Sequence, residues 1–275
     1  MKKESLYKIL IIIGLLFTFG CEDVIELDLD SAEPRLVVDA SIDWIKGESG
    51  KEQKIILSTT TDYYSEEFPS VSNAIISVTN TSGKVFQFVE MEELGEYICH
   101  DFEPEIGEEY HLRIELNDEV YIANETLVSA PNIEEEMEQI DDGGFTGEDI
   151  EVTYYYQDNP DTDNYYLHSI TSPIYQYPKY HTSNNKFSQG NLMSTTFMDE
   201  DIEPGDVLHF KLYGISRRYY EYFNKILDAS GNSGNPFATV PSAVRGNIVN
   251  TTNEENFVFG YFRLSEVSSR DYTIE

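Results

Sequence analysis

Cys21 is the residue whose type and position point most directly to a chemical modification. It ends an apolar run, Leu6 to Phe19, that follows a basic start, and the small residue Gly20 stands before it. A short apolar run after lysines is typical of a cleaved signal peptide, because spanning a bilayer takes about 20 apolar residues. Residues 17–21 resemble a lipoprotein cleavage site, which predicts a signal peptide over residues 1–20 and membrane-anchoring acyl chains on Cys21. An ordinary cleaved signal peptide without lipid is the alternative.

Acidic residues follow Cys21 at once. They are Glu22, Asp23, Glu26, Asp28 and Asp30. Glu22 and Asp23 resemble an export signal that sends lipoproteins to the outer face of the outer membrane, so we expect a lipid-anchored protein at the cell surface. A solvated acidic tether over residues 21–33 explains the same residues without export. Asp30-Ser31-Ala32 resembles an O-glycosylation sequon with Ser31 as the acceptor, and an ordinary polar tether also fits it.

The 51 Asp and Glu residues are too numerous to define a catalytic pair by themselves. Asp158, Asp161 and Asp163 are close enough in sequence to suggest a calcium loop, but they lack the glycine and the closing glutamate of an EF-hand. A turn between two strands explains the same residues. The five histidines form no zinc motif, and no G-x-S-x-G nucleophile motif occurs. We therefore expect no metal site, no cofactor and no catalytic residues.

Tyrosine, present 20 times, supplies the candidates for ligand contact. Tyr175, Tyr177 and Tyr180 lie in a polar stretch, 172–205, that we expect to be a long loop, and long ordered loops are often functional. Their flat rings could stack on sugar rings or contact a protein loop. Neighbouring strand residues point to opposite faces, so about half of the clustered tyrosines would belong to the core instead.

Two further residues have competing explanations. Arg245, which precedes Gly246 and Asn247, could hold an anionic ligand, but a tight turn with Arg245 paired to a carboxylate explains the motif better. Cys99 is the second of two cysteines, so lipidation of Cys21 leaves it without a disulfide partner. It lies in a predicted strand, where we expect it to be a small buried residue.

The formal charge of −33 excludes several classes of function. Nucleic-acid binding needs lysine and arginine to neutralise phosphate, and attachment to anionic lipid needs them as well. The charge favours solubility and repulsion between copies. Because 40% of the residues are hydrophobic and 13% aromatic, the chain has enough apolar surface for a packed core.

The elements that would position these residues are mostly strands. Between residues 34 and 130, about seven short segments separated by turn signals predict an Ig-like β-sandwich. Leu112–Leu116 shows the alternation of apolar and polar residues most clearly. Residues 131–149 have the composition of an acidic junction, and residues 150–275 predict a second β-rich domain. The predicted fold class is therefore all-β.

One helix interrupts the second region. Tyr219, Tyr222 and Ile226 recur at the spacing of one helical face, and Ser216 can cap the start, which predicts a helix over residues 216–229. We expect its apolar stripe to pack as core, with docking of a partner as the alternative.

Several stretches together resemble a known family. They are Ile25–Asp28, Leu36–Ala40, Val71–Val78, Asp158–Pro160, Asn164–Tyr166, Asn235–Ala238, Val244–Ile248 and Phe259–Phe262. The chain resembles DUF4249, a family of Bacteroidota outer-membrane lipoproteins without an established activity. It departs from the family pattern at Thr162 and Asp163, where many members have a glycine.

Members of DUF4249 are often encoded beside a TonB-dependent outer-membrane receptor. The resemblance therefore implies a non-enzymatic surface lipoprotein that captures substrate for such a receptor or gates it. A glycan-binding module or a cell-surface enzyme that uses the Tyr-rich C-terminal region is the alternative, and a structural adhesin is a third possibility. These are inferences from resemblance and composition, because fold and family do not by themselves fix function.

Overall fold

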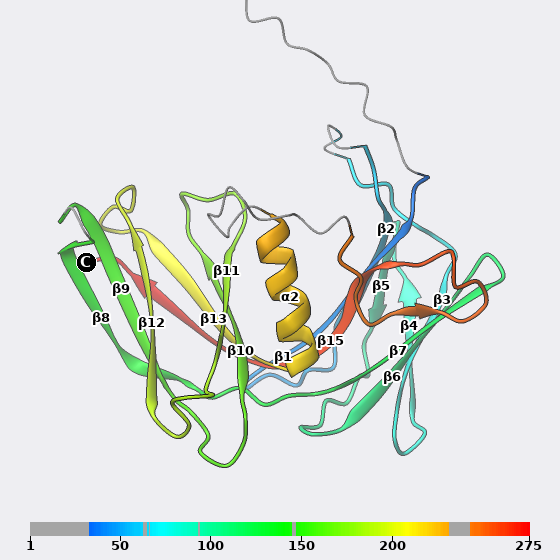
Figure 1. Ribbon diagram of the computed structural model, residues 1–275, viewed down its shortest axis with the longest axis horizontal. Helices are drawn as coiled ribbons and strands as arrows, with labels where there is room; N and C mark the ends of the chain where they lie inside the picture. The colour runs from blue at the N-terminus through cyan, green and yellow to red at the C-terminus, as the bar shows by residue number, and fades with distance from the viewer. Residues whose placement is uncertain (1–32, 63–64, 66, 93, 145–146, 231–242) are drawn as a thin grey trace, which may run out of the picture. The chain divides into compact units, whose positions relative to one another are not determined.

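The computed structural model describes residues 33–62, 65, 67–92, 94–144, 147–230 and 243–275. The chain divides into two compact units, Met1–Glu33 and Pro34–Glu275, and every element below belongs to the second. Strands dominate this unit, which holds a 12-stranded sheet, a 3-stranded sheet and one described helix (Figure 1). The prediction of an all-β fold is confirmed.

The part of the large sheet that runs from β1 (Leu36–Ile45) to β14 (Val249–Asn250) folds over on itself and forms a sandwich around one core. One layer contains β1, β2 (Gln53–Thr59) and β5 (Glu96–Cys99). The other contains β4 (Val85–Glu90), β3 (Ile75–Asn80), β6 (Glu109–Leu116), β7 (Glu119–Thr126) and β14. Alternate residues of both layers are buried in a shared cluster, as period-2 side-chain geometry requires.

The second sandwich packs the other end of the large sheet against the small sheet. Its large-sheet strands are β11 (Lys179–Asn184), β10 (Tyr165–Thr171), β13 (Val207–Ile215) and β15 (Phe259–Thr273). The small sheet is β12 (Leu192–Asp199), β9 (Asp149–Gln157) and β8 (Ile133–Gly143). Large aromatic side chains, among them Tyr154, Tyr156 and Phe210, fill the space between the two layers.

Strand β15 belongs to both sandwiches. Its first part pairs in parallel with β1, from Val37–Phe259 to Ile45–Val267. Its second part pairs antiparallel with β13, from Val207–Thr273 to Tyr213–Val267. The C-terminal part of the chain therefore completes the sheet that the N-terminal part begins, and β14 likewise returns to pair with β7.

Two stretches differ from the sequence-based expectation. Residues 131–149, expected as an acidic junction, contain β8, whose glutamates face solvent while Ile133 and Met137 pack into the second core. Residues 172–205, expected as a long loop, contain β11 and β12, so that expectation is wrong. Both stretches have mostly polar, outward-facing residues. A strand is recognised in a sequence by apolar residues at every second position, so these strands give little signal.

The predicted helix is present as α2 (Arg217–Ala229). Ser216 caps it, because the Ser216 hydroxyl accepts a hydrogen bond from the Tyr219 amide at 3.1 Å. Tyr219 is buried beneath the helix against Tyr213 and Tyr261 of the large sheet, so this face packs as core. No helix within the described ranges has the length and apolar character needed to cross a membrane.

Candidate functional site

Four of the residues singled out from the sequence lie outside the described part of the chain. They are Cys21, Glu22, Asp23 and Ser31. The lipid anchor, the export signal and the glycosylation site therefore stay predictions.

The three candidate tyrosines do not form one surface. The Tyr175 hydroxyl donates to the Asp199 carboxylate, and its ring packs against the second core. Tyr180 lies on the other side of β11, with its ring 5.7 Å from that of Phe223 on α2. Tyr177 is the most exposed of the three, at 73%, compared with 38% for Tyr180. A stacking platform built from all three is therefore not present.

Asp158 is a buried hub of hydrogen bonds rather than one corner of a calcium loop. Asp158 is only 1% exposed. One oxygen of its carboxylate accepts hydrogen bonds from the Tyr166 hydroxyl at 2.5 Å and from the side-chain amide of Asn164 at 3.2 Å. The other oxygen accepts from Asn185 at 2.8 Å and from the Gly190 backbone at 2.9 Å. Desolvation alone would raise the pKa of Asp158, but these hydrogen bonds outweigh it and lower the pKa below its usual value.

Asp161 and Asp163 do not join Asp158. The Asp161 amide donates to the side chain of Asn159, and the Asp163 carboxylate accepts from Gln189. The described residues contain no group of three or more His, Cys, Asp or Glu side chains placed to hold a metal ion. The arrangement fits the turn explanation, in which Asp and Asn side chains bond to nearby backbone.

A second buried network surrounds His168, a residue that the sequence analysis does not single out. The His168 Nδ1 lies 2.5 Å from the Tyr154 hydroxyl, and its Nε2 lies 2.7 Å from the Ser183 hydroxyl. The His181 ring stacks on it at 4.2 Å. Burial lowers the pKa of His168 well below its usual value, so the imidazole is neutral. His168 lies two residues after Tyr166 in β10, so the two side chains point to the same face of the sheet, towards the second core.

Cys99 is buried, as expected for a small apolar residue. Burial raises the pKa of its thiol to about 11. The thiolate is the reactive form of cysteine, so a raised pKa and a closed environment make this side chain inert.

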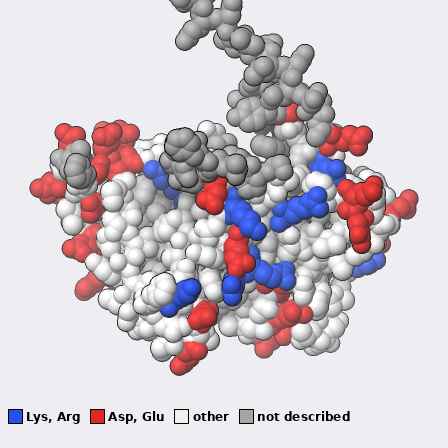
Figure 2. Space-filling model, viewed as in Figure 1, with Lys and Arg blue, Asp and Glu red and all other residues white. Residues whose placement is uncertain are grey.

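A hollow lined by charged side chains lies beside α2, and we call it the cationic groove. Arg218, Lys225 and Arg245 line it together with Tyr222 and Tyr261, around a volume of about 290 Å³. Figure 2 shows Lys and Arg gathered over α2 in the middle of this face, whereas Asp and Glu lie mostly towards its edges. In a chain with 51 acidic and 18 basic residues, this local excess of positive charge is unusual.

The backbone next to Arg245 is clamped onto β15. The Asn247 side chain donates to the Phe262 carbonyl at 2.8 Å and accepts from the Phe262 amide at 2.9 Å, as a neighbouring strand would. Gly246 lies directly on the backbone of Gly260, where an added Cβ would come within 1.7 Å of the carbonyl oxygen. The Gly-Asn pair therefore serves close backbone packing and fixes where Arg245 emerges.

Arg245 does not form an ion pair with a described carboxylate, contrary to the expectation from sequence. Its guanidinium carbon lies 3.7 Å from the centre of the Phe257 ring. The guanidinium of Arg35 lies 3.9 Å from the centre of the same ring. This cation–π contact holds the guanidinium of Arg245 against the ring of Phe257.

A buried carboxylate fixes the helix side of the groove. Glu125 of β7 accepts from the Ser216 hydroxyl at 2.9 Å and from the Tyr261 hydroxyl at 3.1 Å. Burial, and next the charge of Glu125, raise the pKa of Tyr261 above its usual value. Arg218 donates to the Asn124 carbonyl at 3.4 Å. The start of α2, the first sandwich and β15 are thereby joined at one point.

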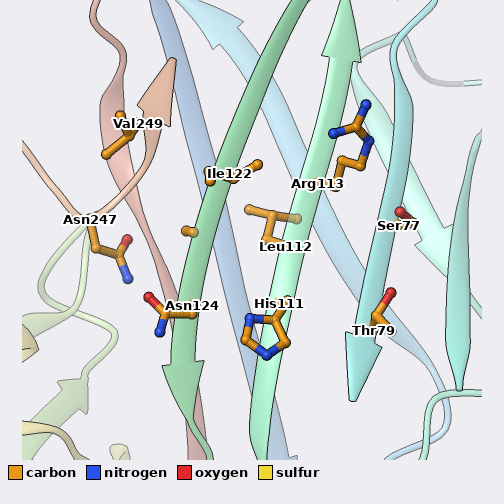
Figure 3. Close-up of a pocket in the computed structure, with 10 residues that line it drawn as sticks. Ser77, Thr79, His111, Leu112, Arg113, Ile122, Asn124, Asn247 and Val249 are labelled. Carbon is orange, nitrogen blue, oxygen red and sulfur yellow. The ribbon is translucent and has the colours of Figure 1, made fainter. Parts of the chain in front are cut away.

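A larger and more apolar hollow adjoins the groove on the outer face of the first sandwich. This sheet-face pocket, of about 510 Å³, is lined by side chains of β3, β6, β7 and β14 (Figure 3). Ile122 and Val249 supply apolar surface and are 42% and 55% exposed. Asn247 lines both hollows, and Asn124, another lining residue, receives the hydrogen bond from Arg218. The two hollows are therefore neighbours on one continuous surface.

Sequence reasoning singles out Arg245 but misses Arg218 and Lys225. A usable signal exists, since Arg218, Tyr222 and Lys225 follow the i, i+4, i+7 spacing that puts side chains on one face of a helix. What the spacing does not reveal is that this face borders the segment that carries Arg245.

A family model described as "Domain of unknown function (DUF4249)" matches residues 22–271. The chain belongs to the DUF4249 family. The match spans both sandwiches and every residue of the cationic groove, so the family resemblance seen in the sequence motifs is confirmed. No curated protein matches this DUF4249 chain.

Solved structures resemble the DUF4249 chain only weakly. A two-domain fibronectin type-III segment of chicken tenascin is 14% identical, covers 66% of this chain and 90% of its own length, and has a TM-score of 0.22. A DUF4785 family protein from Legionella pneumophila is 10% identical over 66% of this chain and 51% of its own, with a TM-score of 0.23.

A trypsin-activated alpha-2-macroglobulin from Escherichia coli is 12% identical, with a TM-score of 0.25. The match covers 67% of the DUF4249 chain and 14% of that structure. Likenesses at this level carry no argument about function.

Proposed function

We propose that this DUF4249 protein is a lipid-anchored lipoprotein of the outer-membrane surface that works by binding a partner and does not catalyse a reaction. The sequence around Cys21 carries the proposal, because a basic start, a short apolar run and a small residue before a cysteine are what lipoprotein processing requires. The acidic residues Glu22 and Asp23 support display at the cell surface.

The described chemistry is consistent with a binding role. Asp158 and His168, two buried titratable groups of the second sandwich, have their polar atoms engaged in hydrogen bonds within the fold. The cationic groove and the sheet-face pocket, by contrast, present side chains to solvent on rigid elements. Open surfaces on a rigid sandwich suit recognition of another molecule.

The proposed partner is a TonB-dependent outer-membrane receptor, which the lipoprotein would serve in substrate capture or gating. The support is the association of DUF4249 members with such receptors, now applied to a chain that belongs to the family. Affinity purification of the protein from membranes in mild detergent should recover a large barrel protein in near-stoichiometric amount. Recovery of the lipoprotein alone after chemical crosslinking on cells would contradict the partnership.

The anchor is tested with a matched pair of cysteine variants. Cys21→Ser should abolish labelling by radioactive palmitate and release the protein from membranes, while Cys99→Ser should leave both unchanged. Protease treatment of intact cells should digest the wild-type protein, because the proposal places it on the outside. Membrane retention of the Cys21→Ser form would refute the anchor, and full protection from protease would refute surface display.

A glycan-binding module or surface enzyme in the Tyr-rich region is the alternative function. Its support is weaker, because the side chains of Tyr175 and Tyr180 make contacts within the fold and Tyr177 is the one of the three that is mostly exposed. Binding to a glycan array that is lost in Tyr177→Ala would favour this alternative.

A further inference from the structure

The three cations of the groove lie together without an ion pair to any carboxylate that the structure describes, although the protein is strongly acidic. Ion pairs among the described residues use Lys46, Lys54, Lys84, Arg113, Lys179, Arg217 and Arg263. Within the same described ranges, Arg218, Lys225 and Arg245 form none. Glu221 lines the groove, but Arg217 engages its carboxylate at 2.8 Å. The groove therefore holds net positive charge ready for an anion.

Two of these cations, Arg218 and Arg245, are positioned by contacts other than ion pairs. Arg245 stacks on Phe257, and its backbone is held by the Asn247 clamp on β15. Arg218 and Lys225 lie on a helix whose start is tied to Glu125. Preorganised guanidinium groups lose little freedom when they bind, and they pair with carboxylates through two parallel hydrogen bonds.

The sheet-face pocket extends this binding surface with apolar character. Ile122 and Val249 are more than one-third exposed, and they lie beside Asn247, which also lines the cationic groove. A ligand that spans both hollows needs anionic groups at one end and an apolar group at the other. A single small anion would leave the apolar hollow unused.

We propose that the cationic groove and the sheet-face pocket together bind an extended acidic peptide segment of a partner protein. Its carboxylates lie against Arg218, Lys225 and Arg245, and an apolar side chain next to them lies in the sheet-face pocket. The inference rests on the proposed function, in which the protein acts by binding a partner, and it names the chemistry of the contact.

Charge disfavours the other occupants. A second copy of this chain carries the same −33, so two copies repel each other at long range. Anionic membranes and nucleic acids present extended negative surfaces that would meet the acidic edges of this face as well as its centre. A short peptide places only a few charges against the cations, within the screening distance of about 8 Å at physiological salt.

The test measures binding of a defined probe to the full processed lipoprotein in detergent. The probe is a fluorescein-labelled peptide, Glu-Asp-Glu-Gly-Leu-Phe, and its neutral match is Gln-Asn-Gln-Gly-Leu-Phe. We expect fluorescence anisotropy to show saturable binding of the acidic probe that weakens as NaCl rises from about 50 to about 300 mM. The neutral probe should bind at least about tenfold more weakly, because it lacks the charge-assisted hydrogen bonds.

Matched variants locate the site. Arg245→Gln should weaken binding by about tenfold or more, whereas Lys51→Gln, an equal charge change at an exposed lysine outside the groove, should leave it unchanged. Ile122→Ser should also weaken binding, and Ile140→Ser, at a residue with the same 42% exposure on β8, should not.

Three results would overturn the proposal. The first is that the neutral probe binds as tightly as the acidic probe. The second is that Arg245→Gln binds the acidic probe with unchanged affinity. The third is that the acidic probe does not bind, whereas inorganic phosphate or vesicles of anionic phospholipid do. None of these measurements involves the receptor, and the peptide probes carry no lipid. Failure here is therefore distinguishable from failure of the proposed function, which the purification from membranes and the Cys21→Ser variant test separately.

Discussion

Asp158 offers the sharpest test of how the second sandwich is held together. Replacing it with alanine removes the acceptor of hydrogen bonds from Tyr166, Asn164, Asn185 and the Gly190 amide, at a position that is 1% exposed. Hydrogen bonds to a charged group contribute about 1.5–3 kcal/mol each, so the four bonds together contribute at most about 6–12 kcal/mol to the free energy of unfolding. Relief from burying the carboxylate offsets several kcal/mol of this, so we expect Asp158→Ala to lower the free energy of unfolding by about 3–5 kcal/mol.

The measurement is urea unfolding followed by far-UV circular dichroism, on protein that begins at Glu22 and carries no lipid. Hydrogen exchange at the Gly190 amide gives a local readout, because this amide loses its acceptor in the variant. Asp161→Ala, at an exposed carboxylate three residues away, is the control and should change stability by less than about 0.5 kcal/mol. A loss below about 1 kcal/mol in Asp158→Ala, with unchanged exchange at Gly190, would refute the hub.

The pH dependence of this hub has a definite sign. The folded-state pKa of Asp158 is lowered, so its contribution to stability is complete above the unfolded value of about 3.9 and is lost as the pH falls through the folded value. The difference in stability between wild type and Asp158→Ala should therefore shrink in acid.

Three further predictions concern one tightly packed glycine and two buried side chains. Gly260→Ala should cost more than about 3 kcal/mol in urea unfolding, because its Cβ would lie 1.9 Å from a carbonyl oxygen of β1, whereas Gly47→Ala, with open space around it, should cost about 1 kcal/mol. Because burial lowers the pKa of His168, the melting temperature should fall as the pH drops below about 6.5, where the unfolded imidazole takes up a proton. The melting temperature of His168→Gln should depend less on pH than that of the wild type, whereas His209→Gln, at an exposed histidine, should behave like the wild type. Equal pH dependence in wild type and His168→Gln would contradict the prediction. Native Cys99, with a thiol pKa of about 11, should react with Ellman's reagent at pH 8 roughly 200-fold more slowly than the urea-unfolded thiol, and equal rates would refute its burial.

The local part of the fold can be read from the sequence because its signals are local. Alternation in Leu112–Leu116 predicts β6, and the spacing of Tyr219, Tyr222 and Ile226 predicts α2. The acidic run hides β8, whose side chains mostly face solvent. The partners of β15 are also hidden, because pairing between residues 36–45 and 259–273 depends on contacts more than 200 positions apart.

The site is less accessible to sequence reasoning than the fold. Arg245 draws attention through its motif, but only the structure places Arg218 and Lys225 beside it. The grouping of Tyr175, Tyr177 and Tyr180 fails for a simple reason. Residues 179–184 form a strand, and alternation turns Tyr180 towards α2, away from the core against which Tyr175 packs.

The shared strand β15 also determines how the protein would respond to force. The chain enters the fold directly at β1, which runs parallel to β15 from Val37–Phe259 to Ile45–Val267. A load drawn between the segment before β1 and the segment after β15 would shear these two strands along their length and stress all of their hydrogen bonds together. Such a geometry resists extension far better than one in which bonds open singly. A load applied between the two ends of this unit would thus fall on its longest strand.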